Sequence, residues 1–262
     1  MVSVRNKVVF GIILITTFVI IVFISINNRS ENDNLTYKED FYNKQIEESE
    51  SVLGKIFDFV DNQLAFVLNP FSDEIYISAK FQRQEHAVTC EIASLRMALN
   101  YLGENVTEDE LIEKINFDTR KSKSLGVWGD PNIGFVGDVN GSVFKGTGYG
   151  VYEKPIQELA SKYRKSAVIK NADLSKVIEN INKRNPVIVW GLLSDTEPIY
   201  WRTNEGKTIG VYPGEHTRIV IGYSGDISNP SKIIMMDPIY GKISMDKDKF
   251  LSDWKKWKIR LS

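Results

Sequence analysis

Four segments between residues 90 and 183 repeat apolar residues at helical spacing. They are residues 90–102, 107–115, 155–165 and 174–183. The first ends before Gly103, which suits a left-handed cap, and the second opens with a capping box from Thr107 to Glu110. Pro155 stands at a favoured first-turn position, and Asp173 can cap the last segment. The pattern therefore predicts four helices.

The spacing of apolar residues changes to that of strands after residue 185. The predicted strands are residues 186–193, 199–203, 208–212, 217–223 and 232–236. The run PVIVWGLL is apolar throughout, which is typical of a strand buried on both faces. Turn-forming residues separate the later strands into two hairpins. Helices followed by strands indicate an α+β fold.

A glycine-rich stretch, residues 126–150, lies between the predicted helices and matches neither the GxGxxG pattern nor a P-loop. We expect it to be a surface loop that borders a cleft. No internal repeat and no low-complexity tract is present in the sequence.

The N-terminal residues have the pattern of a membrane segment. Residues 8–26 read VVFGIILITTFVIIVFISI, without a charge, and a helix of this length rises about 28 Å, close to the hydrocarbon core of a bilayer. Arg5 and Lys7 precede it, so the positive-inside bias places residues 1–7 in the cytoplasm and residues 27–262 outside. No small-x-small cleavage site follows. We expect an uncleaved transmembrane signal anchor, with the lipid bilayer as a partner.

Residues 27–68 are predicted to connect this anchor to the rest of the chain. They are acidic, and from residue 45 onward their apolar positions recur at helical spacing, which predicts a linker followed by an amphipathic helix. Asn69 and Pro70 then break the helix. We expect residues 69–262 to form one domain.

The composition excludes several classes of protein. Of the 262 residues, 42% are hydrophobic and 26% are charged, so the chain can bury a core and is not disordered throughout. The formal net charge is −1, which provides no basic field for nucleic acid. The single cysteine excludes an internal disulfide and a thiolate-rich metal site, and the cysteine and two histidines have no recognised metal-ligand spacing. We expect neither a metal nor a cofactor.

Cys90, His216 and Asp237 are the candidates for catalysis. Cys90 begins a predicted helix, where free N–H groups favour a thiolate with a low pKa, although a lone cysteine is often only a small apolar filler. His216 precedes one strand of a predicted hairpin and Asp237 follows the other. An unbulged hairpin centred between Asp226 and Ile227 would make them direct cross-strand neighbours, and the carboxylate would orient the imidazole.

A thioester route also needs donors for the developing oxyanion. The backbone N–H of Cys90 supplies one, and the side-chain amide of Gln84 or Gln82 can supply the second. His86 lies four residues before Cys90 and is a competing base, but no strand beside it is predicted to carry an acid. A cysteine at a helix start with a histidine and an acid on a sheet is the papain-type arrangement.

The sequence resembles the bacteriocin-processing peptidase-like family, peptidase family C thirty-nine-like, whose members have a papain-like fold. The resemblance covers about residues 75–260 and rests on segments that follow in order: FQRQEHAVTCEIASLRMALNYLG (Phe81–Gly103), WGDPNIGFVG (Trp128–Gly137), GYGVY (Gly148–Tyr152), PVIVW (Pro186–Trp190), GEHTRIVIGYSG (Gly214–Gly225) and MDPIYG (Met236–Gly241). It implies Cys90 as nucleophile, His216 as base and Asp237 as orienting acid. Gln84 matches the oxyanion glutamine of the processing peptidases, and Gln82 that of the membrane or secreted branch.

The processing peptidases proper are fused to an ATP-driven exporter, and this sequence has no such segment. We therefore expect a membrane-anchored form without an exporter domain, for which a Gly-Gly leader is not the expected substrate. The function that follows is a cysteine peptidase-like hydrolase at the membrane of a bacterial cell, with its catalytic domain extracytoplasmic and a peptide or protein as substrate. The alternatives are an acyl or peptidyl transferase and a catalytically silent binding or immunity-type module on the same fold.

Overall fold

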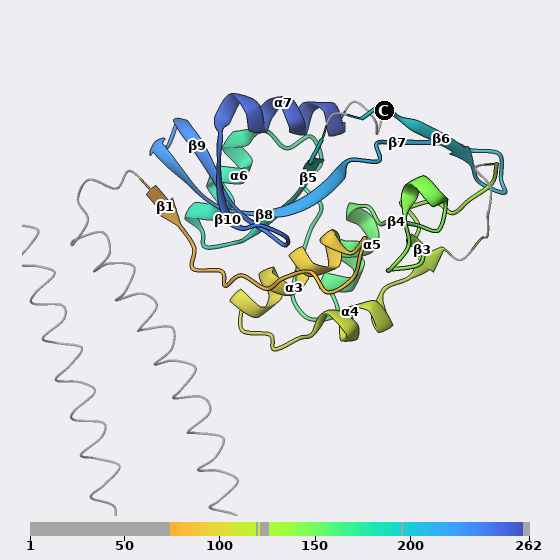
Figure 1. The fold of residues 1–262 in the computed structure, drawn as a ribbon. Coiled ribbons are helices and arrows are strands. Elements are labelled where there is room, and N and C mark those ends of the chain that lie inside the picture. The colour runs from red at the N-terminus through yellow and green to blue at the C-terminus, as the bar shows by residue number, and fades with distance from the viewer. Residues whose placement is uncertain (1–73, 119, 121–125, 195, 259–262) are drawn as a thin grey trace, which may run out of the picture. The chain divides into compact units, whose positions relative to one another are not determined.

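The computed structural model describes residues 74–118, 120, 126–194 and 196–258 (Figure 1). These residues fall within one unit, residues 65–262. The predicted anchor at residues 8–26 and the predicted linker and helix at residues 27–68 lie outside the described residues. Within the described ranges, no helix combines the length and the apolar character that crossing a bilayer requires.

A five-stranded antiparallel sheet is built around β8 (Glu215–Asp226). On one edge β8 pairs with β9 (Asn229–Asp237), which pairs in turn with β10 (Gly241–Asp246). Along its other edge β8 pairs first with β5 (Val187–Leu192) and then with β1 (Glu74–Tyr76). Since β8 is 12 residues long, it can pair with three strands, and its first residues, Glu215 and His216, pair with β5.

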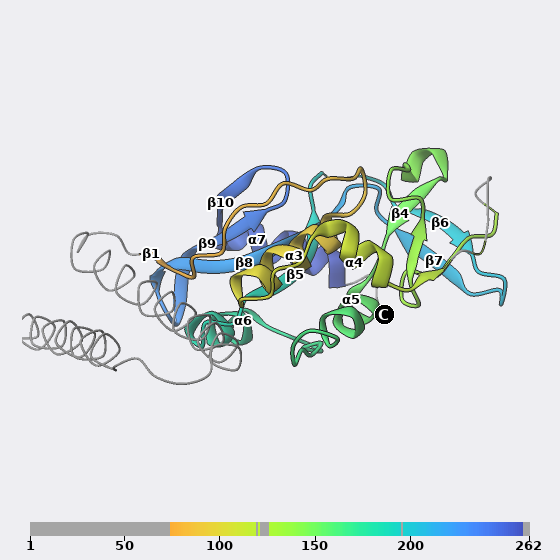
Figure 2. The same ribbon diagram turned by 90° about the horizontal axis from the view of Figure 1, so that it is seen from below.

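Helix α3 (Cys90–Tyr101) covers one face of this sheet, and α6 (Leu174–Asn182) and α7 (Lys247–Lys258) cover the other (Figures 1 and 2). Successive side chains of β8 point to opposite faces of the sheet, so the strand packs against helices on both faces. Ile219 and Ile221 pack with residues of α3, whereas Val220 packs with residues of α6 and α7. The sheet is therefore buried between two helical layers.

A second apolar core lies on the far side of α3 from its contacts with the sheet. It is surrounded by α4 (Glu108–Lys114), α5 (Glu153–Ala160), a hairpin of β6 (Ile199–Arg202) and β7 (Thr208–Val211), and a sheet of β2 (Phe117–Asp118), β3 (Phe135–Gly137) and β4 (Gly148–Gly150), with a short 3₁₀ helix at Val143–Lys145. Trp201 is almost fully buried there and donates its indole N–H to the carbonyl of Gly129 at 2.8 Å.

The structure confirms the predicted helix starts at two caps. Thr107 and Glu110 form the capping box of α4, and the Asp173 side chain accepts from the amide of Lys176 at the start of α6. Gly103 has a φ of +93° directly after α3, as a left-handed cap requires. The predicted hairpin between residues 199 and 212 is also present as β6 and β7.

Three predictions about the fold need correction. Residues 126–150 are not simply a surface loop, because they contain β3 and β4, and Phe135 and Val136 are fully buried. Helix α5 begins at Glu153 and ends at Ala160, so it starts before Pro155 and stops short of residue 165. Strands β8 and β9 extend beyond the predicted limits at both ends, since bulges and polar residues within them hide the apolar alternation.

Candidate functional site

Cys90 is the first residue of α3 and is 7% exposed. The residue before it, Thr89, does not cap the helix with its side chain, because its hydroxyl donates to Oε1 of Glu108 at 2.5 Å. Thr89 thus leaves the first N–H groups of α3 uncapped beside the thiol, although the Glu91 carboxylate accepts from its own amide. This is a position at which a developing negative charge is favoured.

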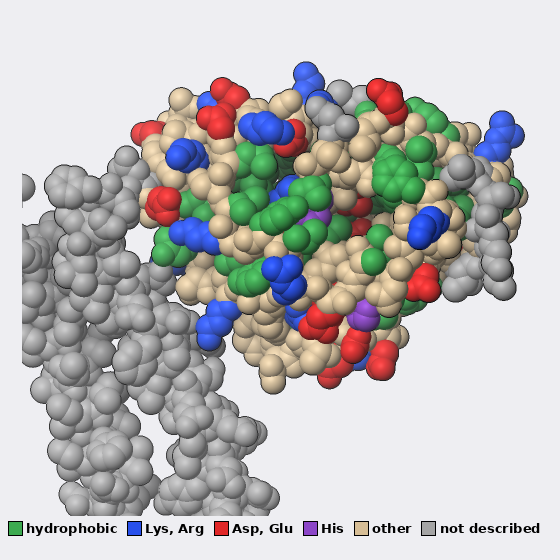
Figure 3. Space-filling view, in the orientation of Figure 1, with side chains coloured by type: hydrophobic (Ala, Val, Ile, Leu, Met, Phe, Trp, Pro, Cys, Tyr) green, Lys and Arg blue, Asp and Glu red, His purple; other side chains and the backbone are tan. Residues whose placement is uncertain are grey.

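Cys90 and His216 line one cavity of about 160 Å³, together with Gln84 and Glu215. The other lining residues are mostly apolar: Ala87, Val88, Val143, Tyr149, Leu193, Pro213 and Ile239. Hydrophobic side chains also gather in the middle of one face of the molecule (Figure 3). The cavity therefore offers an apolar wall and a small set of groups that can perform chemistry.

His216 is held by Asp237. The Nε2 atom of His216 lies 3.0 Å from Oδ2 of Asp237, and both residues are buried. Within the described ranges the other ring nitrogen, Nδ1, has no protein hydrogen-bond partner. This arrangement fixes the ring and leaves Nδ1 able to exchange a proton.

The predicted contact is present, but the predicted register of the hairpin is wrong. Asp226 pairs with Asn229, so the loop consists of Ile227 and Ser228 and its centre lies one residue later than expected. Ile219 pairs with Met236, and one further step along the two strands brings Asp237 opposite Arg218. His216 therefore reaches Asp237 diagonally, over a separation that long side chains can span.

Arg218, which no sequence motif indicates, completes the surroundings of Asp237. Its Nε donates to Oδ2 at 2.7 Å, while Oδ1 accepts the backbone amides of Ile239 at 2.8 Å and Tyr240 at 3.1 Å. Burial alone would raise the pKa of Asp237, but these donors and His216 outweigh it and hold the pKa well below its ordinary value. Asp237 is therefore ionised at neutral pH.

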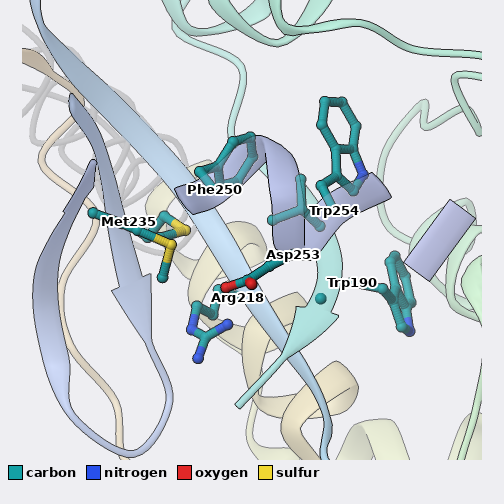
Figure 4. A pocket seen from close by; sticks show the side chains of 9 residues that line it. Trp190, Arg218, Met235, Phe250, Asp253 and Trp254 are labelled. Carbon is teal, nitrogen blue, oxygen red and sulfur yellow. The ribbon is translucent and has the colours of Figure 1, made fainter. Parts of the chain in front are cut away.

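The guanidinium of Arg218 also borders a small cavity of about 10 Å³ behind the site, which is room for about one water molecule. Figure 4 shows Arg218 from β8 close to Asp253 from α7, among the residues that line this space. Asp253 also accepts from Lys249 at 2.8 Å with both oxygens. Helix α7 thus lines the small cavity next to Arg218 and is absent from the lining of the Cys90 cavity.

The two candidate glutamines are placed differently. Gln84 lines the cavity of Cys90 and donates from Nε2 to the carbonyl of His86 at 2.6 Å, while its buried Oε1 has no partner among the described residues. Gln82 accepts from Asn100 at 3.0 Å, near the opposite end of α3. The geometry brings Gln84, and not Gln82, to Cys90.

His86, the competing base, is directed to other partners. Its Nε2 lies 3.0 Å from Asp109 of α4 and its Nδ1 lies 3.3 Å from Asn140. Burial acts to lower its pKa, but these contacts and nearby acids outweigh it, and the pKa is raised. His86 is not among the residues that line the cavity of Cys90.

The protonation state of the thiol differs from the expectation. Burial raises the pKa of Cys90 well above its ordinary value, and the charges of Glu91 and Glu215 raise it further. Burial also lowers the pKa of His216, against the opposing effect of Asp237. The expectation of a low-pKa thiolate is therefore wrong for this arrangement, in which thiol and imidazole are both neutral near pH 7.

Cys90, Glu91 and Glu215 place one ligand-type atom each within 4.8 Å of one another, which is a spacing that could hold a metal ion. The two carboxylates also accept hydrogen bonds from the protein. Glu91 accepts the amide of Val151 at 2.8 Å, and Glu215 accepts the hydroxyl of Thr217 at 3.1 Å.

No motif in the sequence indicates a role for Glu91, Glu215 or Arg218. Glu91 follows the candidate nucleophile directly, Glu215 precedes the candidate base, and Arg218 follows that base by two positions on the same strand face. An acid next to a cysteine at a helix start is the signal that could have identified Glu91.

The chain is similar to known proteins in sequence and in fold. Residues 76–260 match the profile of the Peptidase_C39 like family. A crystal structure from Bacillus anthracis, assigned as a C39-like peptidase, is similar with a TM-score of 0.60 and 26% identity, over 70% of this chain and 92% of that chain. The uncharacterized protein YvpB of Bacillus subtilis is 35% identical over 173 residues, which is 63% of this chain. The match spans 64% of the length of YvpB.

Proposed function

Because the chain belongs to the Peptidase_C39 like family, we propose that it is a cysteine peptidase-like hydrolase that cleaves an amide or peptide bond through a thioester. The observation that carries the proposal is the convergence of Cys90, His216 and Gln84 on one cavity, with His216 held by Asp237. These are the parts that acyl transfer to a thiol requires: a nucleophile, an oriented base and a donor for the oxyanion.

In the proposed reaction Cys90 Sγ attacks the substrate carbonyl while Nδ1 of His216 takes the thiol proton. Asp237 stabilises the imidazolium that forms, since its carboxylate already accepts from Nε2. The imidazolium then gives the proton to the leaving amine. Water, deprotonated by the same nitrogen, hydrolyses the thioester and regenerates the thiol.

The oxyanion would receive the backbone N–H of Cys90 and a side-chain N–H of Gln84. An amide nitrogen carries two hydrogens, so the bond from Nε2 of Gln84 to His86 leaves one for the substrate. Gln82 is not part of this proposal, because it is bonded at the other end of α3.

The apolar lining of the cavity favours a peptide or protein substrate with an uncharged side chain beside the scissile bond. We also propose that residues 8–26 anchor the protein in the cell membrane with the hydrolase outside. Intact mass of the membrane fraction, together with protease accessibility in intact wall-stripped cells, tests this part separately.

An electrophilic amide-mimic probe tests the catalytic proposal directly. Wild-type protein should form a covalent adduct on Cys90, Cys90→Ala should form none, and His216→Ala should lose at least about a hundredfold in labelling rate, the size expected when a general base is removed. His86→Ala is the matched control and should label like wild type. Equal labelling of His216→Ala and wild type would contradict the proposal, and wild-type protein that does not label would favour a silent binding module.

If labelling occurs, product analysis with a peptide library decides how the thioester is resolved. Release of free carboxylate supports hydrolysis. Products that carry an added amine instead would replace hydrolysis with acyl or peptidyl transfer on the same residues.

A further inference from the structure

Glu91 is a fully buried carboxylate that the proposed reaction does not use. It is the second residue of α3, and its Oε1 accepts the amide of Val151, just after β4, at 2.8 Å. Gly150 makes room for it, since a Cβ at that position would clash with Oε1 of Glu91. One oxygen of this carboxylate is therefore committed to joining α3 to β4.

The other oxygen faces the nucleophile. Oε2 of Glu91 accepts the S–H of Cys90 at 3.5 Å, and the backbone of Thr217 on β8 also bonds the sulfur, which favours the thiolate. The carboxylate of Glu215, on β8, lies in the same cluster. One of its oxygens is within 4.8 Å of Sγ of Cys90 and of a carboxylate oxygen of Glu91. Ionisation of the thiol would thus add a negative charge next to two carboxylates, in a site from which water is largely excluded.

We propose that Glu91 is a positioning residue that holds the proton of Cys90 in the resting site and so sets the pH at which the thiol ionises. The inference deepens the proposed function, because that function gives Cys90 the attacking role. The inference can be tested separately from the proposed function, because thiol ionisation can be measured without any substrate.

The hydrogen bonding of the Cys90 thiol depends on whether Glu91 is ionised or protonated. With Glu91 ionised, the S–H donates to Oε2, and His216 must compete with a carboxylate for this proton. With Glu91 protonated, its own O–H can donate to Sγ, and the thiol proton is available to His216 Nδ1. Burial raises the pKa of Glu91 to about 7 against the opposing bonds from Val151, its own amide and Cys90, so both states occur near neutral pH.

The groups that face this pair come from three elements. Cys90 lies on α3, Glu215 and His216 lie on β8, and the amide of Val151 follows β4. Of these, Glu215 adds to the repulsion and Val151 favours the ionised carboxylate. A test must therefore distinguish Glu91 from Glu215.

The pH dependence of Cys90 alkylation by a small neutral reagent makes this distinction. In Glu91→Gln, the amide oxygen can still accept from Val151, while the amide nitrogen donates to sulfur. The midpoint of alkylation should move down by about one pH unit or more, which is about tenfold in rate on the rising limb. Glu215→Gln is the matched control and should shift the midpoint less.

An unchanged midpoint in Glu91→Gln, or a larger downward shift in Glu215→Gln, would overturn the inference. A catalytically inactive protein with the expected shift would contradict the proposed function and leave this inference intact.

A second measurement does not need the Glu91 variant to fold. Infrared titration of the wild-type protein should reveal a buried carboxyl group that loses its proton near pH 7. Removing the S–H donor in Cys90→Ala should raise the pKa of this carboxyl, because that hydrogen bond favours its ionised form. A carboxyl signal that does not respond to Cys90→Ala would overturn the inference.

Discussion

Asp237 is the residue on which the polar interactions of the site converge. Its two oxygens together accept from His216, Arg218 and the amides of Ile239 and Tyr240. All of its acceptor capacity serves donors that are themselves buried or part-buried. A neutral replacement at this position therefore leaves Arg218 as a buried charge without its counter-ion.

Papain-type enzymes can use an asparagine to orient the histidine, but here we expect Asp237→Asn to lower the free energy of unfolding markedly. Removing one partner of a buried pair costs about 3–5 kcal/mol, so urea unfolding should show a free energy of unfolding lower by about 3 kcal/mol. The double variant Arg218→Leu with Asp237→Asn should recover part of the loss, because the unpaired charge is gone. Additive losses in the double variant would show that the two side chains act independently.

The sequence predicted the positions of the candidate residues in their elements better than it predicted the contacts between them. Cys90 at a helix start and His216 beside Asp237 follow from local patterns, and both placements hold. The diagonal contact did not follow, because the loop is centred one residue later than the pattern predicts, and the register shifts after Val220 and after Ser224 cancel each other. The raised pKa of Cys90 did not follow either, since burial by distant segments is not visible in a local pattern.

At the scale of elements, β8 organises the fold. It pairs with β9 on one edge and with β5 and β1 on the other, and it carries His216 near its start. Sequence patterns predicted its middle but missed β10 and α7, since the segment after residue 240 alternates polar and apolar residues only weakly. Helix α7 is amphipathic over a short span that is rich in lysine, and tertiary packing on β5 and β9 decides its conformation.

Gly222 of β8 permits the close approach of β1, and its replacement tests how far the strand depends on it. A Cβ at Gly222 would clash with the backbone carbonyl of Ile75, which is a group that cannot rotate away. We expect Gly222→Ala to release β1, seen as faster hydrogen exchange at the amide of Ile77, which donates to Ile221.

The matched control for this variant is Ser224→Ala, on the same strand and opposite Glu74 of β1. It adds no atom and should leave that exchange rate unchanged. Similar exchange in both variants would show that β1 is held by contacts other than the close approach at Gly222.

At the scale of the whole molecule, two buried carboxylates make stability depend on pH in opposite directions. Glu91 has a pKa raised to about 7, so it contributes stability below its ordinary value of 4.5 and loses it as pH rises through about 7. Asp237 has a lowered pKa, so it contributes stability above its ordinary value of 3.8 and loses it as pH falls. Both contributions are present together only in mildly acidic solution.

Glu91→Gln should remove the loss of stability that accompanies a rise in pH from 4.5 through about 7. Between pH 4.5 and 8 the free energy of unfolding of wild type should fall relative to that of the variant, by on the order of 3 kcal/mol. Glu179→Gln is the control: its exposed carboxyl, paired with Lys176 and Lys183, has a pKa lowered to about 2 and should change nothing over this range. Parallel curves for wild type and Glu91→Gln would contradict the expectation.

The spacing of the site residues along the chain has a consequence for the order in which contacts form. His216 and Asp237 are 21 residues apart and belong to one hairpin, whereas contacts of α3 with β8, such as Ser94 to Thr217, close a loop of 123 residues. Hairpins form in microseconds, and long loops close later because their entropic cost must be overcome first. The contact between His216 and Asp237 is thus expected to form before Cys90 packs beside them. A nascent chain would therefore be chemically inert until its last long-range contacts form.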